Sequence, residues 1–181
     1  MKAMSTDLPE VLMLEPRIFS DHRGCFYESW NARVFAAITG RAVEFVQDNH
    51  SCSVRNALRG IHYQVVHPQG KLVRVTSGSV LDVAVDLRRS SLTFGRWIAV
   101  ELSAENSRQL WIPPGFGHGY LVRSESATLV YKTTEYWMPE HDRSVRWNDP
   151  ELGIEWGIEG SPILSTKDAE APLLVDAELL P

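Results

Sequence analysis

The chain has 181 residues, of which 44% are hydrophobic and 23% are charged, and its formal net charge is −5. These values are typical of a globular protein with one compact core, and they exclude general disorder. The acidic balance also argues against binding to duplex nucleic acid, which usually requires a basic surface. We therefore expect a single domain over residues 1–181 and no nucleic-acid partner.

Membrane association is not expected either. No stretch of the chain reaches the roughly 18 consecutive apolar residues that a spanning helix needs, and the N-terminus lacks the apolar core of a signal peptide. The only two cysteines, Cys25 and Cys52, are far apart and form no CxxC pair. These observations predict a cytoplasmic protein with reduced cysteines.

The first regular element predicted along the chain is a helix over residues 30–39. Trp30, Val34 and Ile38 share one helical face, and Gly40 is suited to end the helix. Short strands rich in β-branched and aromatic residues follow, separated by turns that contain glycine or proline. They cover residues 71–76, 79–87, 97–102, 109–112 and 128–134.

The stretch 79–87 shows the clearest period of two. Apolar residues at 81, 83, 85 and 87 share one face, and Asp82, Ala84 and Asp86 share the other. Short strands at this spacing predict a mainly β sandwich or barrel with a few short helices. The tail from about residue 165 to 181 is expected to form short helical turns that cover the barrel.

A PxGxxH motif occupies residues 113–118 and resembles the second motif of the cupin superfamily. The first cupin motif usually supplies HxH, but this chain has His62, Tyr63 and Gln64 there. Zinc or iron normally needs three protein ligands, and only His62 and His118 are evident. We therefore expect no metal and no cofactor; a metal-dependent cupin, such as a dioxygenase or phosphosugar isomerase, is the alternative.

Ordered motifs from about residue 16 to 168 sharpen the resemblance. They are DxRGxFxE, QDNxSxS, LRGxHxQ, GKLVRV, DVAVDLRxxSxTFG, PxGFxHG, a Tyr-Lys pair, WNDP and SxKD. This series is similar to the dTDP-4-dehydrorhamnose 3,5-epimerase family. The resemblance implies a cupin-like jelly-roll barrel that inverts carbons 3 and 5 of dTDP-4-keto-6-deoxyglucose.

The reaction itself requires a base, an acid on the opposite face and a cation, because the 4-ketone acidifies the neighbouring C–H bonds and an enolate forms. The resemblance implies that His62 is the base, paired with Asp168, and that Tyr131 is the acid. From spacing alone, Tyr131 would be interpreted as a core tyrosine. Lys71 is the expected oxyanion stabiliser, since its ammonium is a compact charge.

The resemblance also implies a set of substrate-binding residues. Arginine suits a pyrophosphate because its planar fork bonds two oxygens. The predicted binding residues are Arg23, Phe26, Glu28, Gln47, Asn49, Arg59, His118, Asp142 and Lys167.

Three positions in this region leave alternatives open. Asp142 stands where the family commonly has glutamate, which is one methylene longer. Asp82 either orients His118 or is an ordinary buried aspartate. Trp137 either stacks on the nucleobase or belongs to the core.

The resemblance further implies a homodimer in which N-terminal strands are exchanged and in which Arg23 and Glu28 serve the partner's site. Exchange would also cover edge strands that otherwise invite aggregation. Some relatives invert only carbon 3 or only carbon 5, so a mono-epimerase is an alternative outcome. A non-catalytic sugar-nucleotide binder is a third reading, which the His62, Asp168 and Tyr131 set argues against.

Overall fold

The computed structural model describes residues 1–181 and confirms the mainly β prediction. The chain forms thirteen strands with two short α-helices and two 3-10 turns. In chain order the elements are β1 (Lys2–Ser5), β2 (Leu12–Glu15), β3 (Phe19–Asp21), β4 (Gly24–Phe26), α1 (Ala32–Thr39), β5 (Gln47–Val54), β6 (Leu58–Gln64), β7 (Lys71–Ser77), β8 (Ser79–Asp86), β9 (Trp97–Ser103), β10 (Gln109–Ile112), β11 (Phe116–Val122), β12 (Ser126–Thr133), η1 (Pro139–His141), β13 (Asp142–Ser144), α2 (Thr166–Ala169) and η2 (Leu174–Asp176).

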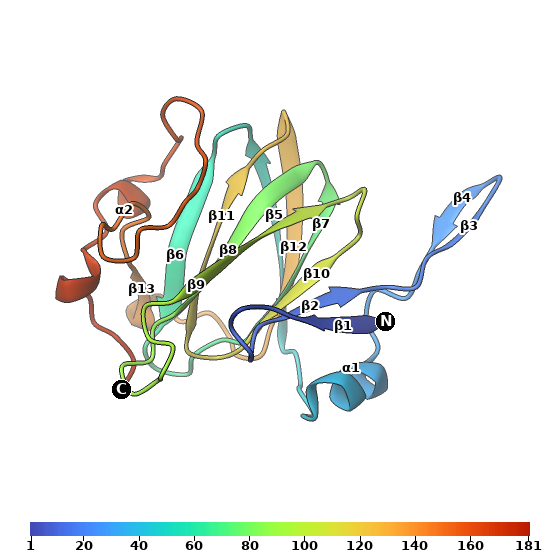
Figure 1. Cartoon of the computed structure of the whole chain (residues 1–181), viewed down its shortest axis with the longest axis horizontal. Coiled ribbons are helices and arrows are strands. Elements are labelled where there is room, and N and C mark those ends of the chain that lie inside the picture. Colours follow the sequence, from blue (N-terminus) through green and yellow to red (C-terminus); the bar gives the residue numbers. More distant parts are fainter.

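Two antiparallel sheets form the body of the molecule (Figure 1). One has six strands in the order β1-β2-β10-β7-β12-β5, and the other has five in the order β13-β6-β11-β8-β9. The main core lies between them, where Val73, Leu110 and Leu129 of the first sheet pack near Val80 and Val122 of the second. The two sheets therefore form the expected sandwich, and a cavity can lie between their inner faces.

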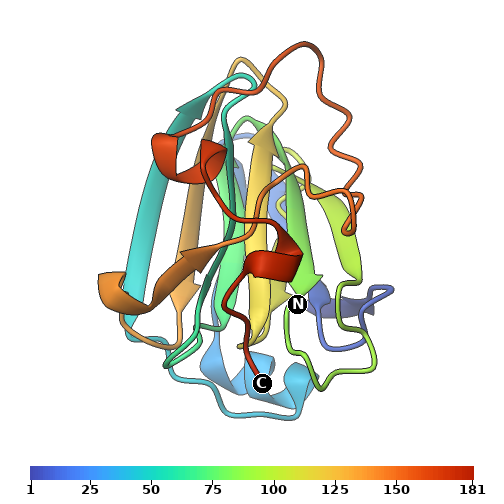
Figure 2. The same cartoon turned by 90° about the vertical axis from the view of Figure 1, so that its left-hand side faces the viewer.

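The outer face of the five-stranded sheet is buried as well. The apolar face of β8 predicted from the sequence, with Val83, Val85 and the following Leu87, packs here against Trp156 and Leu174 of the C-terminal segment. Figure 2 shows this segment crossing the sheet. The face of β8 that carries the aspartates therefore points into the barrel, between the sheets.

Helix α1 is shorter at its start than predicted. The Asn31 side chain accepts hydrogen bonds from the backbone N–H groups of Arg33 and Val34, which caps the helix and leaves Trp30 outside it. Gly40 ends the helix in the left-handed conformation, as predicted. The helix buries Phe35 against the outer face of the six-stranded sheet.

The N-terminal strands β1 and β2 form one edge of the six-stranded sheet. Strands β1 and β2 pair with each other, and β2 pairs with β10 of the same chain. Only the hairpin β3–β4 projects from the body (Figure 1), and its Phe26 is 73% exposed. No helix in the structure is long and apolar enough to cross a membrane.

Candidate active site

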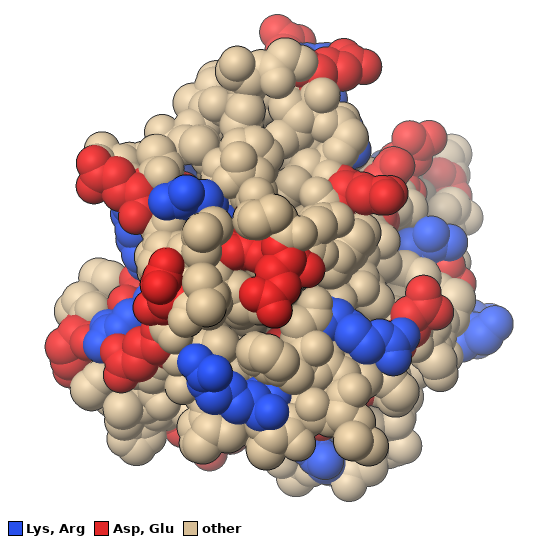
Figure 3. All heavy atoms as spheres, turned by 60° about the vertical axis from the view of Figure 1, so that its left-hand side comes forward, with Lys and Arg blue, Asp and Glu red and all other residues tan.

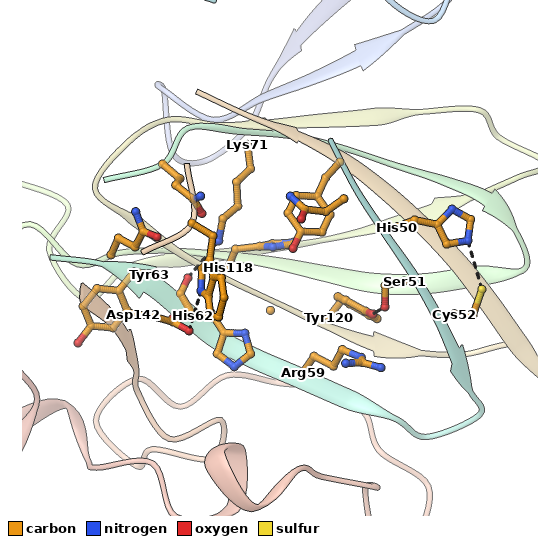
Figure 4. Close-up of a pocket in the computed structure, with 16 residues that line it drawn as sticks. His50, Ser51, Cys52, Arg59, His62, Tyr63, Lys71, His118, Tyr120 and Asp142 are labelled. Atoms are coloured by element: carbon orange, nitrogen blue, oxygen red, sulfur yellow. Dashed lines mark hydrogen bonds between the residues drawn. The ribbon is translucent and has the colours of Figure 1, made fainter. Parts of the chain in front are cut away.

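A cavity of about 420 Å³ opens between the inner faces of the two sheets. Side chains from both sheets reach it, so residues far apart in the sequence meet there (Figure 4). Seven of the predicted site residues line it: Asn49, Arg59, His62, Lys71, His118, Tyr131 and Asp142.

The close approach of β6 and β11 forms the floor of this cavity. Gly60 has a φ of +122°, and a Cβ atom there would lie 2.4 Å from the Cα of Gly119. Only glycine fits such a contact. The approach brings His62 directly opposite His118 in the strand register, which explains why the LRGxHxQ and PxGxxH motifs belong to one site.

His62 and Asp168 form a hydrogen-bonded pair. His62 Nε2 lies 2.5 Å from a carboxylate oxygen of Asp168, and the other oxygen accepts a hydrogen bond from the Ser165 hydroxyl at 2.7 Å. The carboxylate is 2% exposed, whereas the imidazole is 32% exposed. Because Nε2 is engaged, Nδ1 is the ring nitrogen left to take a proton.

The environment of Asp168 favours its ionised form. Burial raises the pKa of this carboxyl, but hydrogen bonds from His62 and Ser165, together with the His62 charge and the Gly60 backbone, outweigh burial and lower it overall. An ionised Asp168 would stabilise an imidazolium at His62.

Lys71 is a buried cation beside this pair. Its side chain is 7% exposed, and its Nζ donates a hydrogen bond to the His62 carbonyl at 3.3 Å. Burial lowers the pKa of Lys71 to about 8, although the nearby Asp142 and Asp82 carboxylates oppose that shift. Lys71 therefore remains mostly charged at neutral pH and can attract a developing negative charge in the cavity.

His118 is held from behind by Asp82. Both carboxylate oxygens lie 3.0 Å from His118 Nε2, and the Asp82 side chain is fully buried. Of the two alternatives left open for Asp82, these contacts favour the one in which Asp82 orients His118.

The structure contains no group of three His, Cys, Asp or Glu side chains arranged to hold a metal ion.

Tyr131 reaches the cavity from β12, where it pairs in register with Asn49 of β5 and Val73 of β7. Burial raises its pKa, and the neighbouring Tyr120 hydroxyl adds to that rise. A phenol with a raised pKa stays protonated near neutral pH, which is the state that an acid needs.

The rim of the cavity carries Trp137, Asp142 and Lys167. Asp142 accepts hydrogen bonds from Lys167 Nζ at 2.6 Å and from the Trp137 ring N–H at 3.2 Å. The Trp137 backbone N–H donates to the Gln47 side chain, which in turn donates to Asn49. Trp137 is 56% exposed, so the core reading of this residue is wrong.

Three predicted binding residues do not reach the cavity of their own chain. Arg23 and Phe26 lie on the projecting hairpin, where Arg23 pairs with Asp21 at 2.6 Å. Glu28 follows the hairpin and accepts a hydrogen bond from Asn31.

Several polar residues line the cavity although no role was predicted for them, among them Ser51, Gln64, Gln69 and Tyr120. All four lie inside or beside the motifs that carry the resemblance. Strand alternation from Asn49 to Ser51, and from His62 to Gln64, was the signal that could have placed two of them on the inner face.

Known proteins resemble the chain over its whole length. The family model described as dTDP-4-dehydrorhamnose 3,5-epimerase matches residues 5–176. A Pseudomonas aeruginosa protein of that name is 55% identical over 181 residues, which is 100% of both chains. A Streptomyces protein named dTDP-4-dehydro-6-deoxyglucose 3-epimerase is 41% identical over 167 residues, covering 92% of this chain and 85% of that protein.

Structural similarity is equally extensive. The crystal structure of dTDP-6-deoxy-D-glucose-3,5-epimerase from Legionella pneumophila, in complex with dTDP-4-keto-L-rhamnose, superposes with a TM-score of 0.95 at 47% identity. The match covers 97% of this chain and 93% of that chain. It confirms the predicted cupin-like jelly-roll fold.

Proposed function

The chain belongs to the dTDP-4-dehydrorhamnose 3,5-epimerase family of isomerases, and from this premise we propose that it inverts carbons 3 and 5 of dTDP-4-dehydro-6-deoxy-D-glucose. The product would be dTDP-4-dehydro-L-rhamnose. The observation that carries the proposal is one cavity that holds His62, backed by Asp168, together with Tyr131 and Lys71.

In this mechanism, His62 Nδ1 removes the proton from carbon 3 or carbon 5. The C–H electrons move toward the 4-keto oxygen, and the Lys71 ammonium stabilises the resulting enolate. Tyr131 then protonates the same carbon from the other face of the ring. His62 ends protonated and Tyr131 ends as a phenolate, so exchange with solvent has to reset both groups before the next inversion.

The remaining residues would hold the nucleotide sugar. Arg59 supplies positive charge for the pyrophosphate, and Lys167 supplies a donor at the Asp142 rim. Asn49 and Gln47 supply amide hydrogen bonds. Trp137 offers an exposed ring on which thymine can stack. No step of this mechanism requires a metal or a redox cofactor.

We further propose a homodimer in which the β3–β4 hairpin reaches the neighbouring chain. Its Arg23 and Phe26, with Glu28 behind them, would then complete the partner's nucleotide site. This is supported by the exposure of Phe26 and by the distance of the hairpin from the body of its own chain (Figure 1).

The decisive experiment is incubation with dTDP-4-dehydro-6-deoxy-D-glucose in heavy water, followed by NMR. Deuterium at carbons 3 and 5 is expected, because the acid is reset from solvent. Deuterium at only one of the two carbons would identify a mono-epimerase, and none at either would refute the proposal.

His62→Ala is the matched control for this experiment. Deuterium incorporation should stop, while dTDP affinity should stay within about twofold because the change removes no nucleotide contact.

Dialysis against a chelator should leave the wild-type rate of epimerisation unchanged. A loss of rate that zinc or iron restored would favour a metal-dependent cupin instead.

A further inference from the structure

Three hydroxyl groups gather beside Arg59 at one end of the cavity. The Tyr120 hydroxyl lies 2.7 Å from Ser51 Oγ and 3.3 Å from Ser53 Oγ, and Arg59 Nε donates to Ser53 Oγ at 3.1 Å. Figure 4 shows Tyr120, Ser51 and Arg59 toward this end, with Asp142 at the other. The mechanism above gives no role to Tyr120, Ser51 or Ser53.

These groups can form a hydrogen-bond chain that ends on a donor. An arginine side chain can only donate, so Ser53 accepts from Arg59 and keeps its own proton. Either atom can donate in the Ser53–Tyr120 and Tyr120–Ser51 contacts. When Ser53 donates to Tyr120 and Tyr120 donates to Ser51, the Ser51 proton is left for a ligand in the cavity.

The same hydrogen bonds orient the Arg59 guanidinium group. Its Nε is engaged by Ser53, whereas neither terminal nitrogen has a protein partner. Two parallel N–H groups therefore remain as a fork for a bidentate anion. With Ser51 as the last donor of the chain, both ends of the network offer protons, which suits phosphate oxygens and not a cation.

We propose that Tyr120 is a positioning residue for diphosphate recognition, acting through Ser53 on Arg59 and through Ser51 on the ligand. The inference rests on the proposed function, since it assigns this end of the cavity to the diphosphate of a nucleotide sugar. Tyr120 is 5% exposed and its ring packs in the main core, so its hydroxyl has a fixed position.

The test is Tyr120→Phe, which keeps the ring in the core and removes only the hydroxyl. The Kd for dTDP, measured by calorimetry, should rise about fivefold, the equivalent of one lost hydrogen bond. The KM for the sugar nucleotide should rise by a similar factor, whereas kcat at saturation should stay within about twofold.

Tyr63→Phe is the matched control. Tyr63 is also buried, and its hydroxyl donates to the Glu178 carbonyl at 2.7 Å beneath the C-terminal segment. Tyr63→Phe removes one buried hydrogen bond and Tyr120→Phe removes two, so both variants should lose thermal stability, but only Tyr120→Phe should weaken dTDP binding. A double-mutant cycle tests whether Tyr120 acts through Ser53. Tyr120→Phe should cost clearly less dTDP affinity in a Ser53→Ala background, because Ser53→Ala has already broken the hydrogen-bond chain.

Two results would overturn the inference. One is an unchanged dTDP affinity in Tyr120→Phe. The other is a fall in kcat as large as that of Tyr131→Phe, which would place Tyr120 in proton transfer. A wild-type protein that binds dTDP without epimerising the sugar would refute the proposed function, and the affinity comparison would still decide the role of Tyr120.

Discussion

His62 and Asp168 are 106 residues apart in the chain and 2.5 Å apart in space. The imidazole is partly open to the cavity and the carboxylate is closed off. Such a pairing holds one tautomer, with Nε2 protonated toward Asp168 and Nδ1 free, and stabilises the positive ring that forms on proton removal. The chemistry of His62 therefore depends on a residue that its own motif does not contain.

Replacing Asp168 by asparagine should expose this dependence. The amide is neutral and can donate to Nε2, which would favour the wrong tautomer, so kcat should fall about 100- to 10,000-fold. Steady-state kinetics and dTDP calorimetry would measure the effect. A fall of less than about fivefold, with folding and dTDP binding intact, would separate Asp168 from the chemistry.

Lys71 predicts opposite effects of alkaline pH on activity and stability. With its pKa lowered by burial to about 8, Lys71 loses its proton above pH 8, and kcat should decline as the oxyanion partner disappears. The folded pKa lies below the ordinary 10.5, so the unfolded chain binds more protons. Its burial therefore destabilises the fold at neutral pH, and this penalty shrinks as pH rises from 8 toward 10.5.

Lys71→Met isolates that penalty. Urea unfolding at pH 7 should show the variant more stable than wild type by up to about 3 kcal/mol, the equivalent of the pKa shift. The difference should narrow by about half at pH 9.5. A difference in the free energy of unfolding that did not change with pH would mean that burial of the Lys71 charge does not destabilise the fold.

At the scale of single elements, α2 has only four residues and depends on Ser165, the residue that precedes it. Ser165 caps it by accepting the Asp168 backbone N–H at 3.1 Å, and the same hydroxyl donates to the Asp168 carboxylate. A helix this short has little stability of its own. The cap therefore fixes both the helix and the direction of the carboxylate.

Ser165→Ala should reduce the free energy of unfolding by about 1 kcal/mol and also lower kcat several-fold, whereas Ser165→Thr should restore most of both. Ser103→Ala is the control, because Ser103 accepts a backbone N–H from Asn106 in a turn that does not line the cavity. Thermal unfolding and kcat measured together would test this. Equal losses of kcat in the two alanine variants would contradict a specific role for Ser165.

At the scale of the whole molecule, different segments pack on the outer faces of the two sheets: α1 on the six-stranded sheet and the C-terminal segment on the five-stranded sheet. The C-terminal segment covers the outer face of the five-stranded sheet (Figure 2). It also brings Asp168 to His62 in the cavity wall. On the face in Figure 3, acidic and basic side chains are interspersed, with no single basic surface. The β3–β4 hairpin projects from the body, and all residues of its two strands are exposed (Figure 1).

If that hairpin packs on a neighbouring chain, Phe26→Asp should weaken the dimer at least tenfold, because it places a charge in an apolar contact. Sedimentation equilibrium would measure this against the 20.4 kDa mass of one chain. Leu92→Asp is the control, since Leu92 is fully exposed on the body. A wild-type protein that sediments as one chain would contradict the homodimer.

Much of the strand pattern was predictable, because alternation and turn residues are local. Strand β10 has the predicted bounds, and β7, β8, β9 and β12 differ by at most two residues at either end. The start of α1 was placed two residues early because periodicity extends through Trp30, whereas the Asn31 cap decides where the backbone turns. Local periodicity could not show that the face of β8 with Val83 and Val85 packs under the C-terminal segment.

The sequence by itself determined the fold class, the family and seven of the 16 residues that line the cavity, because local periodicity and ordered motifs carry that information. Tertiary structure decided which groups meet. It gave the predicted His62–Asp168 pair its geometry, placed Asp82 on His118 and joined Tyr120 to Arg59 through Ser53. The physical reason is that hydrogen bonds and burial depend on distances between strands, which no spacing along the chain encodes.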